Sequence, residues 1–265
     1  MNRRTFLSLI AVAPAGYAAG SPIEKAFDHL FNFEFAQAQA VTGESMKDPV
    51  AHCVRAAALL FSEFSRLNIW EGEDFFASGH RSKSKPDPKL RTAFFAAIEE
   101  TRRLAHQSLE SNSRDTTALL CQMMSYSFES NYVAYVERRS MASFDMCKKS
   151  QLWADKLLAA DRKFHDAYLT TGLNEYMLGA LPAMVRWAVK IETAKGDKQK
   201  GLQHLEMAAR NGHYFPAFAK LLLAVFYERE KRIDRATATL RELSSSYPRN
   251  PLFTAQLARM QQKKS

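Results

Sequence analysis

The stretch that constrains this chain most is Ala217–Pro251, which reads AFAKLLLAVFYEREKRIDRATATLRELSSSYPRNP. Apolar residues recur at helical spacing on both sides of a charged turn, and Pro248 follows the second run. This pattern predicts two helices, each with one apolar face, joined as a hairpin. Each apolar face must be buried against another element, so we expect the hairpin to pack against further units of the same kind.

The composition of the whole chain favours an all-α fold. Helix-forming residues such as Ala, Leu, Glu and Lys are abundant, whereas the 265 residues include only 10 glycines and 9 prolines. Long alternating runs of β-branched residues are absent from the sequence. The length exceeds that of a usual single domain, but an elongated helical array tolerates it because each unit packs only on its neighbours.

Apolar periodicity and helix-start signals place further helices along the chain. Pro49 marks one start as a first-turn proline, and Asp115 marks another as a capping carboxylate. The expected helical segments are two short helices in Ile23–Gly43, then Val50–Leu67, Lys89–Asn112, a helix after Asp115, Ser140–Ala160, Phe164–Leu178 and Lys198–Arg210.

Two insertions, near 68–88 and 182–193, interrupt the helical period. The first contains Gly, Ser, Pro and charged residues together with Trp70 and two phenylalanines. We interpret it as a segment whose aromatic side chains hold it against the array. The alternative is a functional loop that contacts a partner, since long connections in compact proteins often have a function.

The first twenty residues, MNRRTFLSLIAVAPAGYAAG, have the layout of a cleavable export signal. Two arginines precede a short apolar run that cannot span a bilayer, and small residues follow it. Arg3–Leu7 resembles the twin-arginine signal, although Asn2 and Ser8 depart from its usual pattern. The resemblance implies export of the folded chain to the periplasm, with residues 21–265 as one mature domain.

The chain is basic, with 37 Lys and Arg against 28 Asp and Glu, a formal charge of +9. Removing Arg3 and Arg4 leaves 35 against 28, which is +7. The basic clusters do not alternate with aromatic residues as in a base-stacking platform, so no nucleic-acid partner is expected. The surplus is interpreted as a solvated surface, and peripheral attraction to the anionic cell envelope is the alternative.

No pattern in the sequence indicates catalysis, a cofactor or a metal. Cys53, Cys121 and Cys147 have no metal-binding spacing, and the seven histidines form no HxxxH or Cys/His cluster. A GxSxG elbow and a glycine-rich phosphate loop are also missing. The cysteines are expected as buried free thiols, with a Cys121–Cys147 bridge as the alternative in an exported protein.

The C-terminal hairpin resembles the tetratricopeptide repeat, whose period is about 34 residues. Lys220 stands where that family usually has Trp, and Leu243 where it has Ala. Phe164–Gly212 is a degenerate second unit, with Gly172 at a small-residue position. The residues that carry the resemblance are Leu223, Ala224 and Tyr227 on the first helix, Ala236 and Leu240 on the second, and Pro248 at its end.

The resemblance implies an irregular, right-handed α-solenoid of antiparallel helix hairpins. In such an array the first helices line a concave face that binds peptides or partner helices. We therefore expect a non-enzymatic periplasmic scaffold that binds a protein or peptide. The alternatives are an envelope accessory protein bound through its basic surface to anionic lipid or glycan, and an enzyme with a site near 68–88. The residues expected at the partner site are Tyr176, Phe218, Leu221, Val225, Glu228 and Arg229, with Arg186 and Trp187 on the inserted helix.

Overall fold

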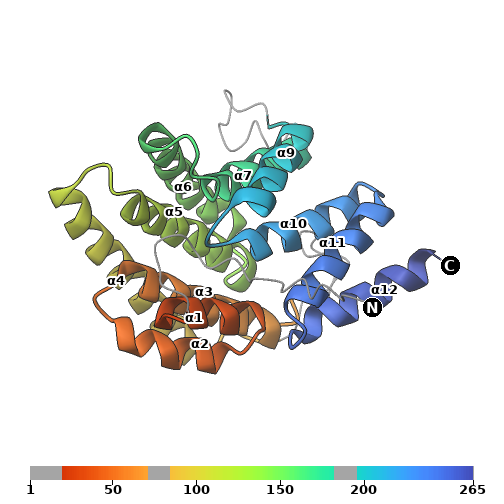
Figure 1. Cartoon of the computed structure of the whole chain (residues 1–265), viewed down its shortest axis with the longest axis horizontal. Helices are drawn as coiled ribbons and strands as arrows, with labels where there is room; N and C mark the ends of the chain where they lie inside the picture. Colours follow the sequence, from red (N-terminus) through yellow and green to blue (C-terminus); the bar gives the residue numbers. More distant parts are fainter. Residues whose placement is uncertain (1–19, 71–83, 182–195, 265) are drawn as a thin grey trace, which may run out of the picture.

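A computed structural model describes residues 20–70, 84–181 and 196–264 of the chain (Figure 1). These residues are predominantly helical and contain no strand, which confirms the all-α prediction. Two short segments add to the α-helices: the 3₁₀ turn η1 (Gly43–Ser45) and the π-helical turn η2 (Tyr132–Val136). The helices are α1 (Pro22–Phe31), α2 (Phe35–Thr42), α3 (Pro49–Arg66), α4 (Pro88–Ser111), α5 (Thr116–Asn131), α6 (Ser140–Ala160), α7 (Ala167–Ala180), α9 (Lys198–Asn211), α10 (Pro216–Arg229), α11 (Ile233–Ser246) and α12 (Pro251–Lys264).

Aspartate side chains cap the N-termini of four of these helices. The predicted cap Asp115 accepts hydrogen bonds from the backbone N–H groups of Thr117 and Ala118, both at 3.0 Å. Asp48 caps α3 in the same way and is followed by the predicted first-turn proline. Asp87 and Asp197 cap α4 and α9, although neither cap was anticipated from the sequence. A carboxylate at this position satisfies N–H groups that have no partner within the helix.

Helices that follow one another in the sequence pack side by side, as the hairpin pattern predicted. The most extensive packing joins α5 to α6 and α7 to α9, followed by α3 with α4 and α10 with α11. Glycines permit a close approach of α7 and α9: a Cβ on Gly201 of α9 would lie 2.6 Å from the backbone nitrogen of Tyr176 on α7. Gly172 faces Gly201 across the same crossing, as its small-residue position suggested.

Replacing Gly201 with alanine is therefore expected to lower the free energy of unfolding by about 1–2 kcal/mol. The methyl group meets backbone atoms, so the two helices must separate, and this overpacking outweighs alanine's higher helix propensity. Urea denaturation followed by circular dichroism measures the change. Gly43→Ala is the matched control, because a Cβ added to Gly43 would have nothing within 4 Å. Equal stabilities of the two variants would contradict the interpretation.

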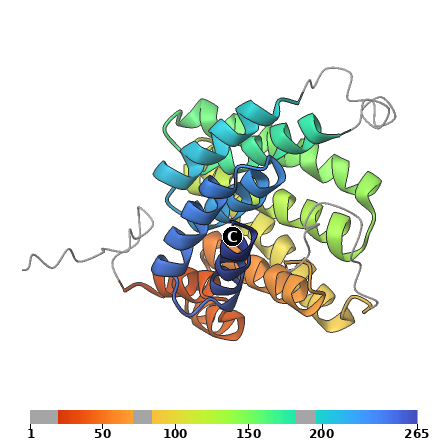
Figure 2. The same ribbon diagram turned by 90° about the vertical axis from the view of Figure 1, so that its right-hand side faces the viewer.

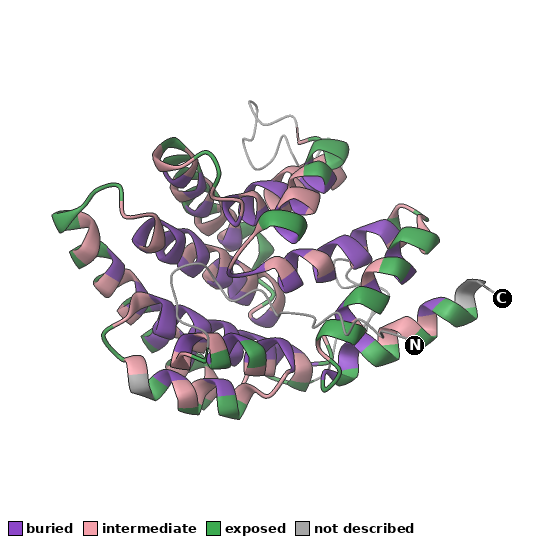
Figure 3. Ribbon diagram, in the orientation of Figure 1, coloured by how far each residue is buried: buried purple, intermediate pink, exposed green. Residues whose placement is uncertain are grey.

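The buried side chains lie where helices face one another, and exposed residues lie on their outer sides (Figure 3). An aromatic cluster joins helices that are distant in the sequence. Phe61 of α3 contacts Phe218 of α10 at a centroid distance of 5.2 Å and Phe128 of α5 at 6.5 Å. Phe215, at the start of α10, contacts Phe128 at 5.9 Å. The first turn of α10 thus packs into a core shared with α3 and α5.

Both ends of the first insertion are fixed to α3. Trp70 is 7% exposed, and its ring contacts Phe61 and Phe64 at 5.3 and 5.2 Å. The Glu63 carboxylate, which has no exposed surface, accepts hydrogen bonds from the backbone N–H of Asp87 and from Arg66. Trp70 therefore holds the connection as predicted. The rest of this insertion (71–83) and residues 182–195, including the second insertion, lie outside the described residues.

The two ends of the described chain contact each other, so the expectation that every hairpin packs only on its sequence neighbours is wrong. Figure 2 shows the blue C-terminal helices beside the red N-terminal ones. Phe27 of α1 contacts Phe215 at 5.4 Å, and Phe31 contacts Tyr247 at 5.5 Å. These apolar contacts close the array because burying aromatic surface is strongly favourable.

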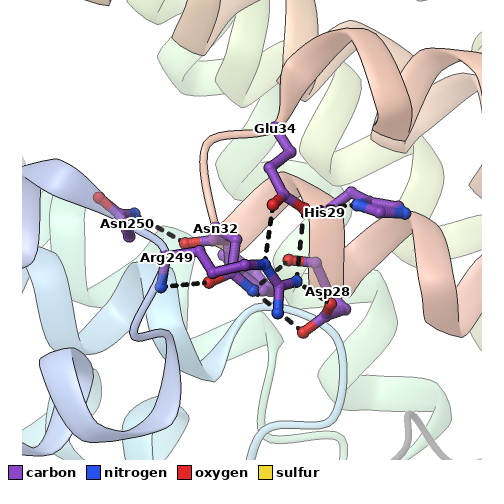
Figure 4. Close-up of polar contacts among 7 residues, drawn as sticks. Asp28, His29, Asn32, Glu34, Arg249 and Asn250 are labelled. Atoms are coloured by element: carbon purple, nitrogen blue, oxygen red, sulfur yellow. Dashed lines mark hydrogen bonds and ion pairs between the residues drawn. The ribbon is translucent and has the colours of Figure 1, made fainter.

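A polar cluster surrounds this junction (Figure 4). Arg249, which follows α11, donates to Glu34 Oε1 and to Asp28 Oδ2, each at 2.7 Å. His29 Nδ1 lies 2.6 Å from the other oxygen of Glu34. The hydrogen bonds from Arg249 and His29 lower the pKa of Glu34. Asn250 is completely buried and donates to the carbonyl oxygen of Phe31 at 2.7 Å. The Tyr-Pro-Arg-Asn-Pro segment that ends the hairpin therefore binds the N-terminal hairpin.

Candidate partner-binding site

The predicted site residues divide between the protein interior and its surface. Tyr176 lies on α7, and the five others within the described residues lie on α10. Tyr176 has no exposed surface, and Phe218 and Leu221 are each 6% exposed. Val225 and Glu228 are half-buried, whereas Arg229 is exposed. Arg186 and Trp187 lie outside the described residues.

Phe218 and Leu221 do not line an open surface, contrary to expectation. Phe218 packs on Phe61 of α3, and Leu221 belongs to the same hydrophobic core. Both side chains were expected on a face left free by neighbouring hairpins. Closure of the array brings α3 against that part of α10, because the buried area offsets the cost of ordering the chain.

The residues that remain together lie at the C-terminal ends of α7 and α10. We call Tyr176, Glu228, Arg229 and Glu230 the helix-end cluster. The Tyr176 ring stacks on Phe226 of α10 with centroids 3.7 Å apart, and its hydroxyl donates to Glu230 Oε1 at 2.9 Å. Burial, followed by the neighbouring Glu230 carboxylate, raises the pKa of Tyr176 well above its usual value. The tyrosine is therefore a fixed, neutral support for the cluster.

An ion pair between α9 and the end of α10 stabilises the helix-end cluster. Lys198 Nζ lies 2.8 Å from Glu230 Oε1. This ammonium lowers the pKa of Glu230 by hydrogen bonding, and the Tyr176 hydroxyl acts in the same direction. Glu230 is consequently an ionised acceptor shared by two donors, and it links the end of α10 to the start of α9.

Arg229 is the exposed member of the cluster. Its guanidinium lies 5.9 Å from the centre of the Tyr176 ring, within the range of a cation–π contact. The charge of Arg229 also opposes the rise that burial produces in the pKa of Tyr135, on η2. Within the described part of the chain, Arg229 forms no ion pair with a carboxylate. An exposed cation beside a buried aromatic ring is suited to bind an acidic or aromatic group of a partner.

Glu228 connects the cluster to the last helix. Its carboxylate accepts from Arg259 Nη2 of α12 at 2.6 Å, and both side chains are about three-quarters buried. Sequence reasoning did not find Arg259, Lys198, Glu230 or Tyr135. Glu230 lay in the segment interpreted as a charged turn, and the contacts of the other three depend on how distant helices pack.

The described residues contain no group of three or more His, Cys, Asp or Glu side chains arranged to hold a metal ion. His52 is buried, and its Nε2 lies 3.0 Å from the carbonyl oxygen of Met46. In the same part of the chain, no helix has both the length and the apolarity needed to cross a membrane.

The three cysteines are free thiols, as expected, and Cys53 and Cys121 are buried whereas Cys147 is only partly buried. Cys121 is completely buried, and burial followed by a hydrogen bond with Cys53 raises the pKa of its thiol. Cys147 Sγ instead lies 2.9 Å from Ser130 Oγ. The alternative of a Cys121–Cys147 bridge is wrong, because Cys121 faces α3 and has Cys53 as its neighbour.

Comparison of the chain with protein-family models, curated proteins and solved structures finds no match.

Proposed function

We propose that this protein is a non-enzymatic, TPR-like scaffold that binds a protein or peptide through the helix-end cluster. One observation carries the proposal: Arg229 is an exposed cation without an ion-pair partner among the described residues, supported by the ring of a buried tyrosine. Arg and Tyr are enriched among residues that dominate binding energies at interfaces. A pre-positioned side chain also loses little conformational entropy on binding.

The architecture agrees with this role. The described helices pack in neighbouring pairs, and the stacked rings of Tyr176 and Phe226 bring α7 into contact with α10. We further propose an irregular solenoid whose closed part forms the apolar core and whose remaining concave surface contains the helix-end cluster. The signal-like residues 1–20 support export to the periplasm, where the partner would be an envelope or periplasmic protein.

Replacing Arg229 with alanine is expected to weaken partner binding by about tenfold or more, because the partner loses its contact with a fixed cation. The partner is first captured from an envelope extract on the immobilised mature protein at moderate salt, and identified by mass spectrometry. Its affinity for the purified variants is then measured by calorimetry.

Arg241→Ala is the matched control, since Arg241 is an exposed arginine on the neighbouring helix α11. Equal affinities of wild type and Arg229→Ala would contradict the proposed site. Binding that both arginine variants weaken equally and that disappears at higher salt would instead support attachment through the general basic surface.

A further inference from the structure

Helix α12 is attached to the rest of the protein along one side only. Of the described helices, α11 is the one that packs along it. Leu252, Phe253 and Met260 are buried, whereas Thr254, Ala255 and Ala258 are exposed. Figure 1 shows α12 at the edge of the molecule, next to α11. A terminal helix that packs along one neighbouring helix opens at a lower free energy than the core helices.

Individual side chains attach α12 to three other parts of the chain. The Phe253 ring lies 6.2 Å from that of Phe33, between α1 and α2. Gln256 donates to the carbonyl oxygen of Trp70 at 3.4 Å, and Arg259 pairs with Glu228 of α10. We call the surface that α12 covers, formed by Phe33, Trp70 and Glu228, the α12-binding surface.

The pattern on α12 defines what fits this surface. Phe253, Leu257 and Met260 follow one another at i, i+4 and i+7, which places them on one side of the helix. Arg259 stands beside them and meets the carboxylate of Glu228. The surface therefore selects an amphipathic helix with three apolar residues at this spacing and a basic residue next to the last.

We propose that the α12-binding surface is a binding site for an amphipathic helix of a partner protein, and that α12 occupies it as an intramolecular inhibitor. This inference rests on the proposed function, because Glu228 belongs to the helix-end cluster and adjoins Arg229. A partner helix of the stated pattern displaces α12 and contacts the helix-end cluster at the same time. The apparent affinity for the partner helix is then the intrinsic affinity multiplied by the fraction of molecules in which α12 has left the surface.

Weakening the attachment of α12 in the full-length protein tests the proposal. The probe is a fluorescent peptide with the sequence of residues 250–264, followed by anisotropy. Arg259→Gln is expected to bind it about fivefold more tightly than wild type, because an ion pair that is largely buried no longer retains the resident helix. Arg241→Gln, the matched control on α11, should bind it as wild type does. No saturable uptake by Arg259→Gln, or equal uptake by all three proteins, would overturn the proposal.

Hydrogen exchange separates release of α12 from general unfolding. Amides of α12 should lose protection in Arg259→Gln while those of α10 keep theirs, and loss of protection in both helices would overturn the proposal.

The two proposals fail separately. Partner affinity that survives Arg229→Ala contradicts the helix-end cluster as the partner site, whereas peptide uptake in Arg259→Gln still supports a helix site beneath α12. If Arg229→Ala loses partner binding but Arg259→Gln takes up no peptide, the proposed function is supported. The proposal that α12 is an inhibitor is then contradicted.

Discussion

Replacing Asp166 with alanine is expected to lower the free energy of unfolding by about 3–5 kcal/mol, the largest effect among these variants. Asp166 is 1% exposed and accepts three backbone hydrogen bonds: His213 N–H at 2.7 Å, Tyr214 N–H at 2.8 Å and Phe215 N–H at 2.9 Å. Alanine leaves these donors without an acceptor, and each unpaired buried group costs about 1–3 kcal/mol before relaxation.

The consequence extends beyond the connection between α9 and α10. Phe215, which one of these hydrogen bonds positions, packs on Phe27 and Phe128 in the closed core. Burial raises the pKa of Asp166, and the three N–H groups act in the opposite direction. The three N–H groups thus stabilise the charged form of the buried Asp166 carboxylate, which in turn is their acceptor. Removing the carboxylate should therefore loosen the packing between α1, α5 and α10.

Urea denaturation monitored by circular dichroism measures this change. Asp166→Asn should destabilise the protein less than Asp166→Ala, because the asparagine Oδ1 still accepts from Tyr214 and Phe215. Its amide nitrogen replaces the oxygen that accepts from His213, so two donors face each other at that contact alone. Asp161→Ala is the control, since Asp161 accepts a single backbone hydrogen bond, from Lys163, in an exposed setting. A loss below about 1 kcal/mol for Asp166→Ala would show that water or relaxation satisfies these groups.

Asn250→Ala is expected to cost about 2–3 kcal/mol, more than Arg249→Ala beside it. The Asn250 amide donates to the Phe31 carbonyl at 2.7 Å, and its Oδ1 accepts from Leu252 N–H at 2.9 Å as the cap of α12. The substitution removes a helix cap, worth about 1 kcal/mol, and leaves a buried carbonyl oxygen unpaired. Arg249 makes more polar contacts, but its side chain is 52% exposed, so solvent screens its ion pairs and they contribute little to stability.

Both variants are compared by denaturation and by hydrogen exchange of α1 and α2. Asn250→Ala should speed exchange in this N-terminal hairpin because the closing contact is lost, while α5 and α6 keep their protection. A larger effect of Arg249→Ala than of Asn250→Ala would contradict the argument from burial. The ion pairs of Figure 4 would then stabilise the junction more than its buried hydrogen bond.

Elements of the fold that depend on near neighbours in sequence were predictable. The break between α1 and α2, the starts at Pro49 and Asp115, and the close helix approach at Gly172 all appear where the residues indicated them. Helical periodicity and capping act over a few residues, so a single sequence contains them in full.

The candidate site was only partly predictable. Arg229 and Glu228 could be placed at the end of a helix. The residues that they contact, Tyr176 and Arg259, come from segments distant in the chain. Phe218 was expected on the surface because an apolar residue on a repeat helix looks the same whether it faces a groove or a core. What distinguishes the two is the position of α3, which no local pattern records.

The sequence by itself determined an all-helical chain with its hairpins, many of its helix ends and one small-residue crossing, since these follow from backbone hydrogen bonding and apolar periodicity. Only the tertiary structure decided that the two ends meet through Asn250, that α12 covers the surface near Trp70, and that Arg229 alone among the described predicted residues stays exposed. Burial of aromatic side chains favours such closure without regard to sequence separation, so the pairing emerges only when the whole chain has packed.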